Sequence, residues 1–241
     1  MIISIMTQQS VQAKKRSIWL SILTIEFFLV LLMLFAVIVF FYAVNLVFIK
    51  KTSDFDNNVF NAIKPYITPA RTRFMSFITF LGKHTFLIPA NFLLVGYFLY
   101  IKKRWLAIRV AMLALSSLFI KIALKAYFQR ERPDIPIITK VSGYSFPSGH
   151  ALISLVFYGL LVYIVWKLVK QKWLKISLSV FFILLFLLIS FSRIYLRVHY
   201  ASDVIAGLAV GFIWLTLSLL IISRIEKRYI AKKLLKAKEL N

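Results

Sequence analysis

The sequence predicts an all-α fold, in which six transmembrane helices form the bundle of a polytopic membrane protein. Of its 241 residues, 61% are hydrophobic and only 16% are charged. The hydrophobic residues gather in runs long enough to cross a bilayer, where a helix satisfies its own backbone polar groups. The sequence contains no cysteine, which excludes disulfides and thiolate metal sites.

Six apolar runs are separated by basic clusters, prolines and polar loops. The first is too long for a signal peptide and has no small-residue cleavage site, so we interpret it as an uncleaved helix. No internal repeat is visible, and residues 1–241 are interpreted as one membrane domain. We expect transmembrane spans at 17–49, 73–101, 106–128, 148–169, 176–196 and 202–223, followed by a basic tail at 224–241.

Two further segments have helical periodicity without the length of a span. Phe55, Val59, Ile63 and Ile67 recur at intervals of four, which predicts a short helix in the membrane interface. The tail at 224–241 alternates isoleucine, leucine and lysine, as an amphipathic surface helix does.

The distribution of positive charge predicts the orientation. The formal net charge of +23 would favour nucleic acid as the partner of a soluble protein. No nucleic-acid-binding motif is present, and in a membrane protein such charge collects on cytoplasmic loops beside anionic lipid. Basic clusters at 14–16, 102–104, 167–175 and 224–238 all fall on one side of a six-span bundle. We therefore predict a plasma-membrane protein with both termini in the cytoplasm and membrane lipids, not nucleic acid, as its partners.

Polar residues from distant segments converge on the opposite, extracytoplasmic side. They occupy the end of the third span, the following loop, and the starts or ends of the last three spans. They are Lys125, Arg132, Ser148, Gly149, His150, Arg193, His199 and Asp203. Hydropathy and charge alone place them at one face, which predicts a shared active site there.

The chemistry of these residues fits a phosphate ester. Lys125, Arg132 and Arg193 supply positive charge, and arginine can hold phosphate oxygens with two parallel hydrogen bonds. Ser148 and Gly149 open a helix, whose N-terminal N–H groups favour an anion. Together these five residues predict a phosphate cradle.

His199, Asp203 and His150 can supply the reaction steps. His199 and Asp203 stand four apart, so in a helical turn the carboxylate holds one ring nitrogen while the other attacks. His150 is then the general acid for the leaving oxygen and later the base for water. Neither a metal nor another cofactor is expected.

These residues form three motifs that resemble the signatures of the type-two phosphatidic acid phosphatase superfamily. The motifs are Lys125-x6-Arg132-Pro133, Pro147-Ser148-Gly149-His150 and Ser192-Arg193-x5-His199-x3-Asp203. The resemblance implies a phosphorylated His199 oriented by Asp203, His150 as acid and base, and a cradle of Lys125, Arg132, Ser148, Gly149 and Arg193. Length and span number are most similar to those of bacterial membrane lipid phosphatases.

The expected function is therefore hydrolysis of the terminal phosphate of a membrane lipid, without a metal. Phosphatidylglycerophosphate, phosphatidate and undecaprenyl pyrophosphate are the candidate substrates. A transporter or lipid-scrambling protein that only binds at the cationic site is one alternative, and a vanadate-dependent haloperoxidase is another. Singly, the site residues have structural explanations: Lys125 can reach the interface and Ser148 can cap a helix. Lys121 and Arg130 are further candidates for contact with lipid phosphate.

Overall fold

The computed structural model describes residues 27–134, 136–137 and 142–239. A helical span over Phe27–Ile49 ends in a π-helical segment, η1 (Asn45–Ile49). The first part of this predicted span, 17–26, and the basic cluster at 14–16 lie outside the described residues. The remaining elements are α2 (Asp54–Ile63), η2 (Lys64–Tyr66), α3 (Pro69–Phe80), α4 (His84–Tyr100), α5 (Arg104–Phe128), α6 (Gly149–Leu168), α7 (Lys172–Tyr195) and α8 (Ala201–Glu239). Within the described ranges there is no strand, and six helical spans are long and apolar enough to cross a membrane, which confirms the predicted fold class.

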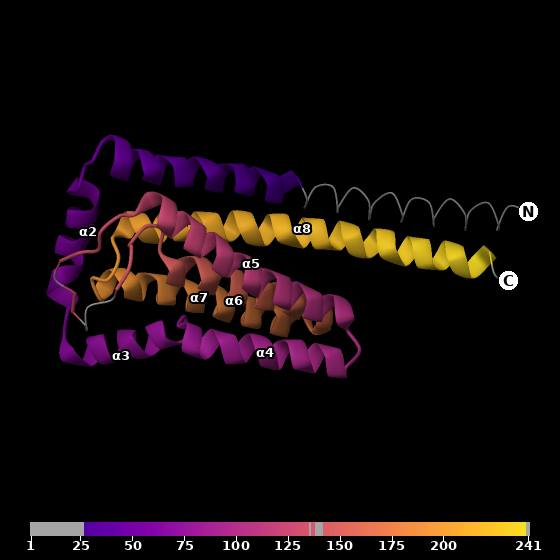
Figure 1. Cartoon of the computed structure of the whole chain (residues 1–241). Helices are drawn as coiled ribbons and strands as arrows, with labels where there is room; N and C mark the ends of the chain where they lie inside the picture. The colour runs from indigo at the N-terminus through magenta and orange to yellow at the C-terminus, as the bar shows by residue number, and fades with distance from the viewer. Residues whose placement is uncertain (1–26, 135, 138–141, 240–241) are drawn as a thin grey trace, which may run out of the picture.

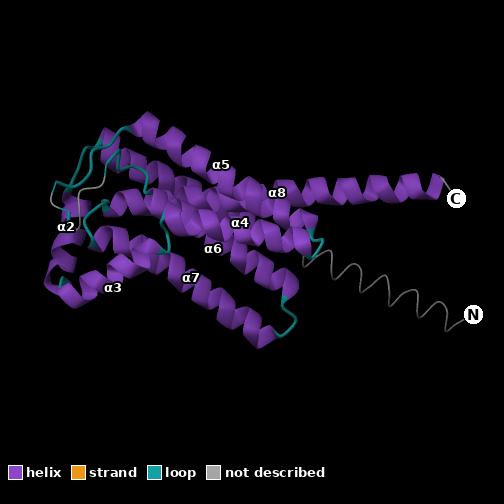
Figure 2. Cartoon of the chain, turned by 60° about the horizontal axis from the view of Figure 1, so that its bottom comes forward, coloured by secondary structure: helices purple, strands orange, loops and turns teal. Residues whose placement is uncertain are grey.

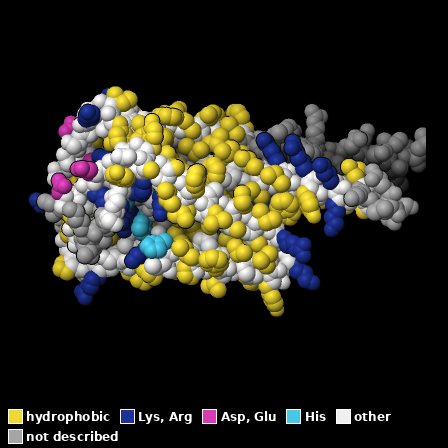
Figure 3. Space-filling view, in the orientation of Figure 1, with side chains coloured by type: hydrophobic (Ala, Val, Ile, Leu, Met, Phe, Trp, Pro, Cys, Tyr) yellow, Lys and Arg dark blue, Asp and Glu magenta, His cyan; other side chains and the backbone are white. Residues whose placement is uncertain are grey.

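The core of the bundle is built around α6. This helix packs against α5, α7 and α8, and α4 packs on α5 (Figures 1 and 2). Leu152, Leu155 and Leu160 of α6 are buried against Leu113 of α5 and Leu215 of α8. Apolar side chains cover most of the outer face seen in Figure 3, as expected of a surface that meets lipid chains.

Small residues let α8 approach α6 closely near the site. A Cβ atom built on Gly207 would lie 2.5 Å from the carbonyl oxygen of Ser148, and one on Gly211 would lie 2.9 Å from that of Leu152. This spacing of four places both glycines on one face of α8, as in other close helix pairs of membrane proteins. The Ser148 N–H also donates to the Asp203 carbonyl at 2.9 Å. The starts of α6 and α8 are thereby fixed side by side.

The short helix predicted after the first span is α2, which lies across one end of the bundle (Figure 1). Its contacts differ from those of the predicted apolar stripe. Val59 and Ile63 pack against the start of α8, but Phe55 is 41% exposed. The buried residue of α2 is instead Asp56, at 2% exposure.

The second span predicted over 73–101 is built from two helices, which together form one candidate span, Pro69–Tyr100. The chain forms α3 and α4, separated by a turn at residues 81–83, and α3 begins at Pro69 because the Thr68 hydroxyl caps it. Only glycine fits at this turn without a shift of its neighbours, because a Cβ at Gly82 would lie 2.6 Å from Ile189 and 2.7 Å from the Ser154 hydroxyl. Lys83 and His84 mark the turn in the sequence, but they lie between two apolar runs, so hydropathy over the whole segment predicted one span.

The last helix begins near the predicted residue but does not end at 223. α8 runs without a break from Ala201 to Glu239, so the tail predicted as a separate surface helix continues the last span. Its second half extends past the bundle, at the end opposite α2 (Figure 1). Exposed lysines and arginines between 224 and 233 occupy this part.

Candidate active site

The end of α5 directs the first arginines of the site. Gln129 adopts a left-handed conformation (φ +46°), and its N–H donates to the Lys125 carbonyl at 3.1 Å. Such a cap ends a helix and turns the chain. Residues 130–132 therefore leave the helix axis and run across the end of the bundle where α2 lies.

A tight turn between α7 and α8 presents His199. Arg197 has a positive φ of 53°, and the N–H groups of Val198 and His199 both donate to the Arg193 carbonyl, at 3.2 and 3.3 Å. His199 lies two residues before α8 begins, so it shares a turn with Asp203 but not a regular helix. Asp203 in turn accepts the Tyr200 N–H at 2.9 Å, which fixes its carboxylate at the start of α8.

One cavity of about 700 Å³ joins a polar end to an apolar groove. Lys121, Lys125, Arg132, His150, Arg193 and His199 line the polar end. Residues of α4 and α5 line the groove, among them Leu87, Phe92, Val95, Ala111, Leu115 and Leu118. In Figure 3, histidine and basic side chains surround the hollow near α2, and apolar side chains continue from it. No Asp or Glu is among the lining residues that the structure describes.

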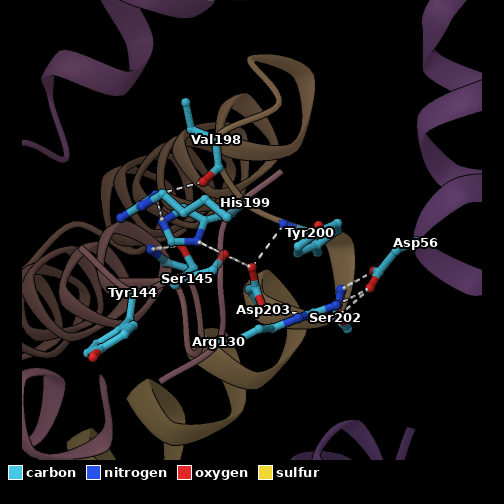
Figure 4. Close-up of polar contacts among 12 residues, drawn as sticks. Asp56, Arg130, Tyr144, Ser145, Val198, His199, Tyr200, Ser202 and Asp203 are labelled. Carbon is cyan, nitrogen blue, oxygen red and sulfur yellow. Dashed lines mark hydrogen bonds and ion pairs between the residues drawn. The ribbon is translucent and has the colours of Figure 1, made fainter. Parts of the chain in front are cut away.

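The hydrogen bonds of His199 define its tautomer. Arg132 Nη1 lies 3.2 Å from His199 Nε2, and because a guanidinium only donates, Nε2 must accept. The proton therefore sits on Nδ1, which faces Ser145 Oγ at 3.2 Å and Asp203 Oδ2 at 3.4 Å. In this arrangement Nε2 faces the cavity with Arg132 as its hydrogen-bond donor, while Nδ1 is held from behind by Ser145 and Asp203 (Figure 4).

Asp203 is fully buried behind His199 and is held by several donors. Its Oδ2 accepts from the Ser145 hydroxyl and the Tyr200 N–H. Its Oδ1 accepts from Arg130 Nη1 at 2.6 Å. A buried carboxylate with this many donors stays ionised and fixed in orientation.

The cations of the predicted cradle are each held by hydrogen bonds to neighbouring carbonyl or hydroxyl oxygens. Lys125 Nζ donates to the carbonyl oxygens of Tyr144 and Ser145, and Arg132 Nε donates to that of Gly143 at 2.8 Å. Arg193 Nη1 donates to the Thr79 hydroxyl at 2.6 Å. These bonds place three positive side chains beside His199.

Arg193 is the least satisfied of these cations. Only 3% of the residue is exposed; among the described residues its side chain has one hydrogen-bond partner, neutral Thr79, and its Nε is buried without one. A buried charge without a counter-ion is costly. The arrangement therefore favours an anion in the cavity.

The residues that open α6 divide between two places. Gly149 and His150 line the cavity, whereas Ser148 is fully buried outside the lining and its hydroxyl caps α6 through the Ala151 N–H. The Ser148 N–H donates to the backbone carbonyl of Asp203 and so does not face a ligand. The structure thus does not bring Ser148 to the cavity with the other predicted cradle residues.

Four residues of the site were not among those predicted for it: Ser145, Arg130, Asp56 and Ser202. Arg130 was considered as a contact for lipid phosphate, but it pairs with Asp203 and, at 2.8 Å, with Asp56. Asp56 also accepts from the Ser202 N–H at 2.9 Å and the Ser202 hydroxyl at 2.7 Å. The partners lie more than 50 positions apart in the chain, so no local spacing pointed to them.

Among the residues that the structure describes, no three His, Asp or Glu side chains gather as ligands of a metal ion. A reaction without a metal remains a prediction.

The charge state of His199 can be tested directly. Burial lowers the pKa of its imidazole to about 3; Asp203 opposes the shift, and Arg193 and Arg132 add to it. Since a base is neutral above its pKa, we expect His199 to stay neutral from pH 8 down to about pH 5. An ordinary histidine gains its proton within this range. Nitrogen NMR of histidine-labelled protein checks this, with the His199→Ala spectrum identifying the signal.

Two variants test the direction in which neighbouring charges shift the pKa of His199. Arg132→Gln removes a charge that lowers the pKa of His199 and should raise it, whereas Asp203→Asn should lower it further. Protonation of wild-type His199 near pH 6.5 would contradict the expectation.

Comparison with known proteins agrees with this geometry. Residues 104–227 match the family model of the PAP2 superfamily. Phosphatidylglycerophosphatase B of Bacillus subtilis (strain 168) is 28% identical over 143 residues, which is 58% of this chain and 69% of that protein. The solved structure of a transmembrane PAP2-type phosphatidylglycerolphosphate phosphatase from Bacillus subtilis has a TM-score of 0.74 at 23% identity, covering 80% of this chain and 96% of that one. LpxE of Aquifex aeolicus is similar with a TM-score of 0.55 at 23% identity, over 67% and 93% of the two chains.

The matched segment covers more than half of the chain, which therefore belongs to the PAP2 superfamily. It is a multi-pass membrane enzyme of the lipid phosphatase type within that family.

Proposed function

We propose that this enzyme removes the terminal phosphate of a membrane lipid through a phosphohistidine at His199. The observation that carries the proposal is the buried, incompletely bonded guanidinium of Arg193 in the same cavity as the Nε2 side of His199. A phosphate group would supply both the missing charge and the missing acceptors. Lys125 and Arg132 border the same space.

The reaction follows from the positions of the two histidines. As Arg132 passes its hydrogen bond from His199 Nε2 to a phosphate oxygen, the Nε2 lone pair attacks phosphorus, the bond to the lipid oxygen breaks, and His150 donates a proton to that oxygen. Asp203 stabilises the positive charge that develops on the imidazole ring. Water then attacks the phosphohistidine while His150 accepts its proton, and His199 regains its Nε2 lone pair as inorganic phosphate leaves.

The apolar groove supports a lipid as the substrate. The cavity continues from the polar end along the facing sides of α4 and α5, where Phe92 is 74% and Leu115 69% exposed. A membrane lipid can place its chain there while its phosphate reaches Arg193. A soluble sugar phosphate would leave this apolar surface uncovered.

The orientation and the substrate follow as parts of the proposal. The basic clusters favour a cytoplasmic position for the end opposite the site, with both termini inside and the active site facing outside. The name of the Bacillus relative favours phosphatidylglycerophosphate, and the groove is equally open to phosphatidate or undecaprenyl pyrophosphate.

The test is phosphate release by the purified protein in mild detergent with EDTA present. The panel contains phosphatidylglycerophosphate, phosphatidate, undecaprenyl pyrophosphate and a soluble sugar phosphate. We expect release from at least one lipid at more than about ten times the sugar phosphate rate. Release from none of the lipids, or equal rates with the sugar phosphate, would refute the lipid assignment.

A further inference from the structure

Behind His199 lies an ionic chain that does not reach the cavity. It runs from Asp203 of α8 through Arg130 to Asp56 of α2 (Figure 4). Asp203 is 0% and Asp56 2% exposed, and the Arg130 side chain is 15% exposed. None of the three lines the cavity, so Arg130 and Asp56 can influence the reaction only through Asp203.

The guanidinium of Arg130 is fixed on several sides. Nη1 donates to Asp203 Oδ1 at 2.6 Å and to the Ser202 hydroxyl at 2.8 Å, while Nη2 donates to Asp56 Oδ2 at 2.8 Å. The guanidinium carbon, Cζ, lies 4.0 Å from the centre of the Tyr200 ring. A planar group held in this way fixes the Asp203 oxygen that does not face His199, and so sets the direction of the one that does.

Charge gives Asp56 a separate task. Asp203 must carry negative charge to stabilise a positive His199, and Arg130 alone would cancel that charge. Asp56 returns the group of three to a net charge of −1. This matters because three cations, Lys125, Arg132 and Arg193, already oppose positive charge on the ring from the cavity side.

We propose that Arg130 is a positioning residue for the phosphatase reaction, and that Asp56 of α2 offsets its charge so that Asp203 remains an effective partner of His199. This inference rests on the proposed role of His199 as nucleophile. It also gives α2 a function in catalysis, although no residue of α2 lines the cavity.

An anchor for α2 is the competing explanation, because the same contacts hold α2 to the start of α8. The two explanations differ in what happens when both charges are removed together. An anchor loses at least as much in the double variant as in either single one. If Asp56 instead balances the charge of Arg130, the double variant regains part of the activity lost in Asp56→Asn, because Asp203 is again a negative charge without a neighbouring cation.

The experiment compares Asp56→Asn, Arg130→Gln and the double variant Asp56→Asn/Arg130→Gln with wild type. The substrate is whichever lipid phosphate the wild type hydrolyses. Asp54→Asn is the matched control, since Asp54 is an exposed acid two residues from Asp56 on α2. Thermal unfolding in detergent tests folding.

We expect Asp56→Asn to lower kcat about tenfold, with KM within about twofold of wild type because the cavity is untouched. Arg130→Gln should lower kcat by a similar factor through loss of orientation. The double variant should have a higher kcat than Asp56→Asn, and Asp54→Asn should equal wild type. Single-turnover phosphorylation of His199 should show the same order.

Several results would overturn the inference. Wild-type kcat in both single variants would do so, and so would a double variant whose kcat is no higher than that of Asp56→Asn. Failure of wild type itself to release phosphate would overturn the proposed function as well, which keeps the two failures distinct. If a charge variant does not fold, Ser202→Ala removes only one hydroxyl of the same network; we expect kcat about threefold lower, and unchanged kcat would count against the inference.

Discussion

Replacing His199 with alanine is expected to lower kcat for lipid phosphate hydrolysis by at least about 10³-fold, to the background of the assay. The variant removes the only ring nitrogen that faces both the cavity and the Arg132 guanidinium. Arg193 and Lys125 remain, so lipid should still bind. Phosphate release measured with a lipid substrate at saturation checks the loss.

Two controls separate loss of the nucleophile from loss of structure. Wild-type protein mixed with phosphate-labelled lipid and quenched in base should carry an acid-labile label, and His199→Ala should carry none. Added imidazole should restore some turnover to the variant, because the space left by the ring adjoins the cavity. A His199→Ala protein that retains turnover above about a tenth of wild type would rule out the phosphohistidine route.

Replacing His150 with glutamine is expected to affect two substrates differently. With a lipid phosphate, whose leaving oxygen needs a proton, kcat should fall by about 10²–10⁴-fold. With an aryl phosphate, the leaving group departs without a proton and phosphorylation of His199 should proceed. The phosphohistidine should then persist, since water lacks a base.

The measurement is a rapid-mixing experiment that follows release of the aryl alcohol. We expect a burst close to one equivalent per enzyme in His150→Gln, followed by a slow steady rate. His199→Ala serves as the control and should give no burst. Equal losses with lipid and aryl substrates would contradict the assignment of His150 as both acid and base.

Hydropathy was a sufficient guide to the spans because the bilayer imposes the same requirement on every helix that crosses it. The exceptions have local causes. The turn between α3 and α4 packs closely on the bundle because Gly82 has no side chain and makes room for Ile189 and Ser154, which both come from other helices. The tail after 223 joins α8 because no proline or glycine interrupts it after Gly211.

The candidate site was predictable where chemistry and spacing agree. His150, Gly149, Arg193 and His199 meet in the cavity with Lys125 and Arg132, and Asp203 lies behind His199. Ser148 differs because a buried serine at a helix start can satisfy the helix N-terminus instead of a ligand.

The network behind Asp203 was not predictable because its partners are held together by folding alone. Asp56 occupies a polar position beside the apolar stripe of α2, where an aspartate usually faces water. Arg130 was equally suited to lipid phosphate by charge. Only the packing of α2 against α8 shows that the two meet and that Asp203 joins them.

The unbroken length of α8 couples the depth of the site to the thickness of the bilayer. At 1.5 Å per residue, its 39 residues measure about 58 Å, whereas a hydrocarbon core is about 30 Å thick. Asp203 near one boundary places Arg224 near the other, about 32 Å away along the helix. A membrane that thins or thickens must therefore tilt α8 or move one of these charged ends relative to the headgroups. Hydrophobic mismatch thus changes the depth, relative to the headgroups, at which His199 meets the phosphate of a lipid.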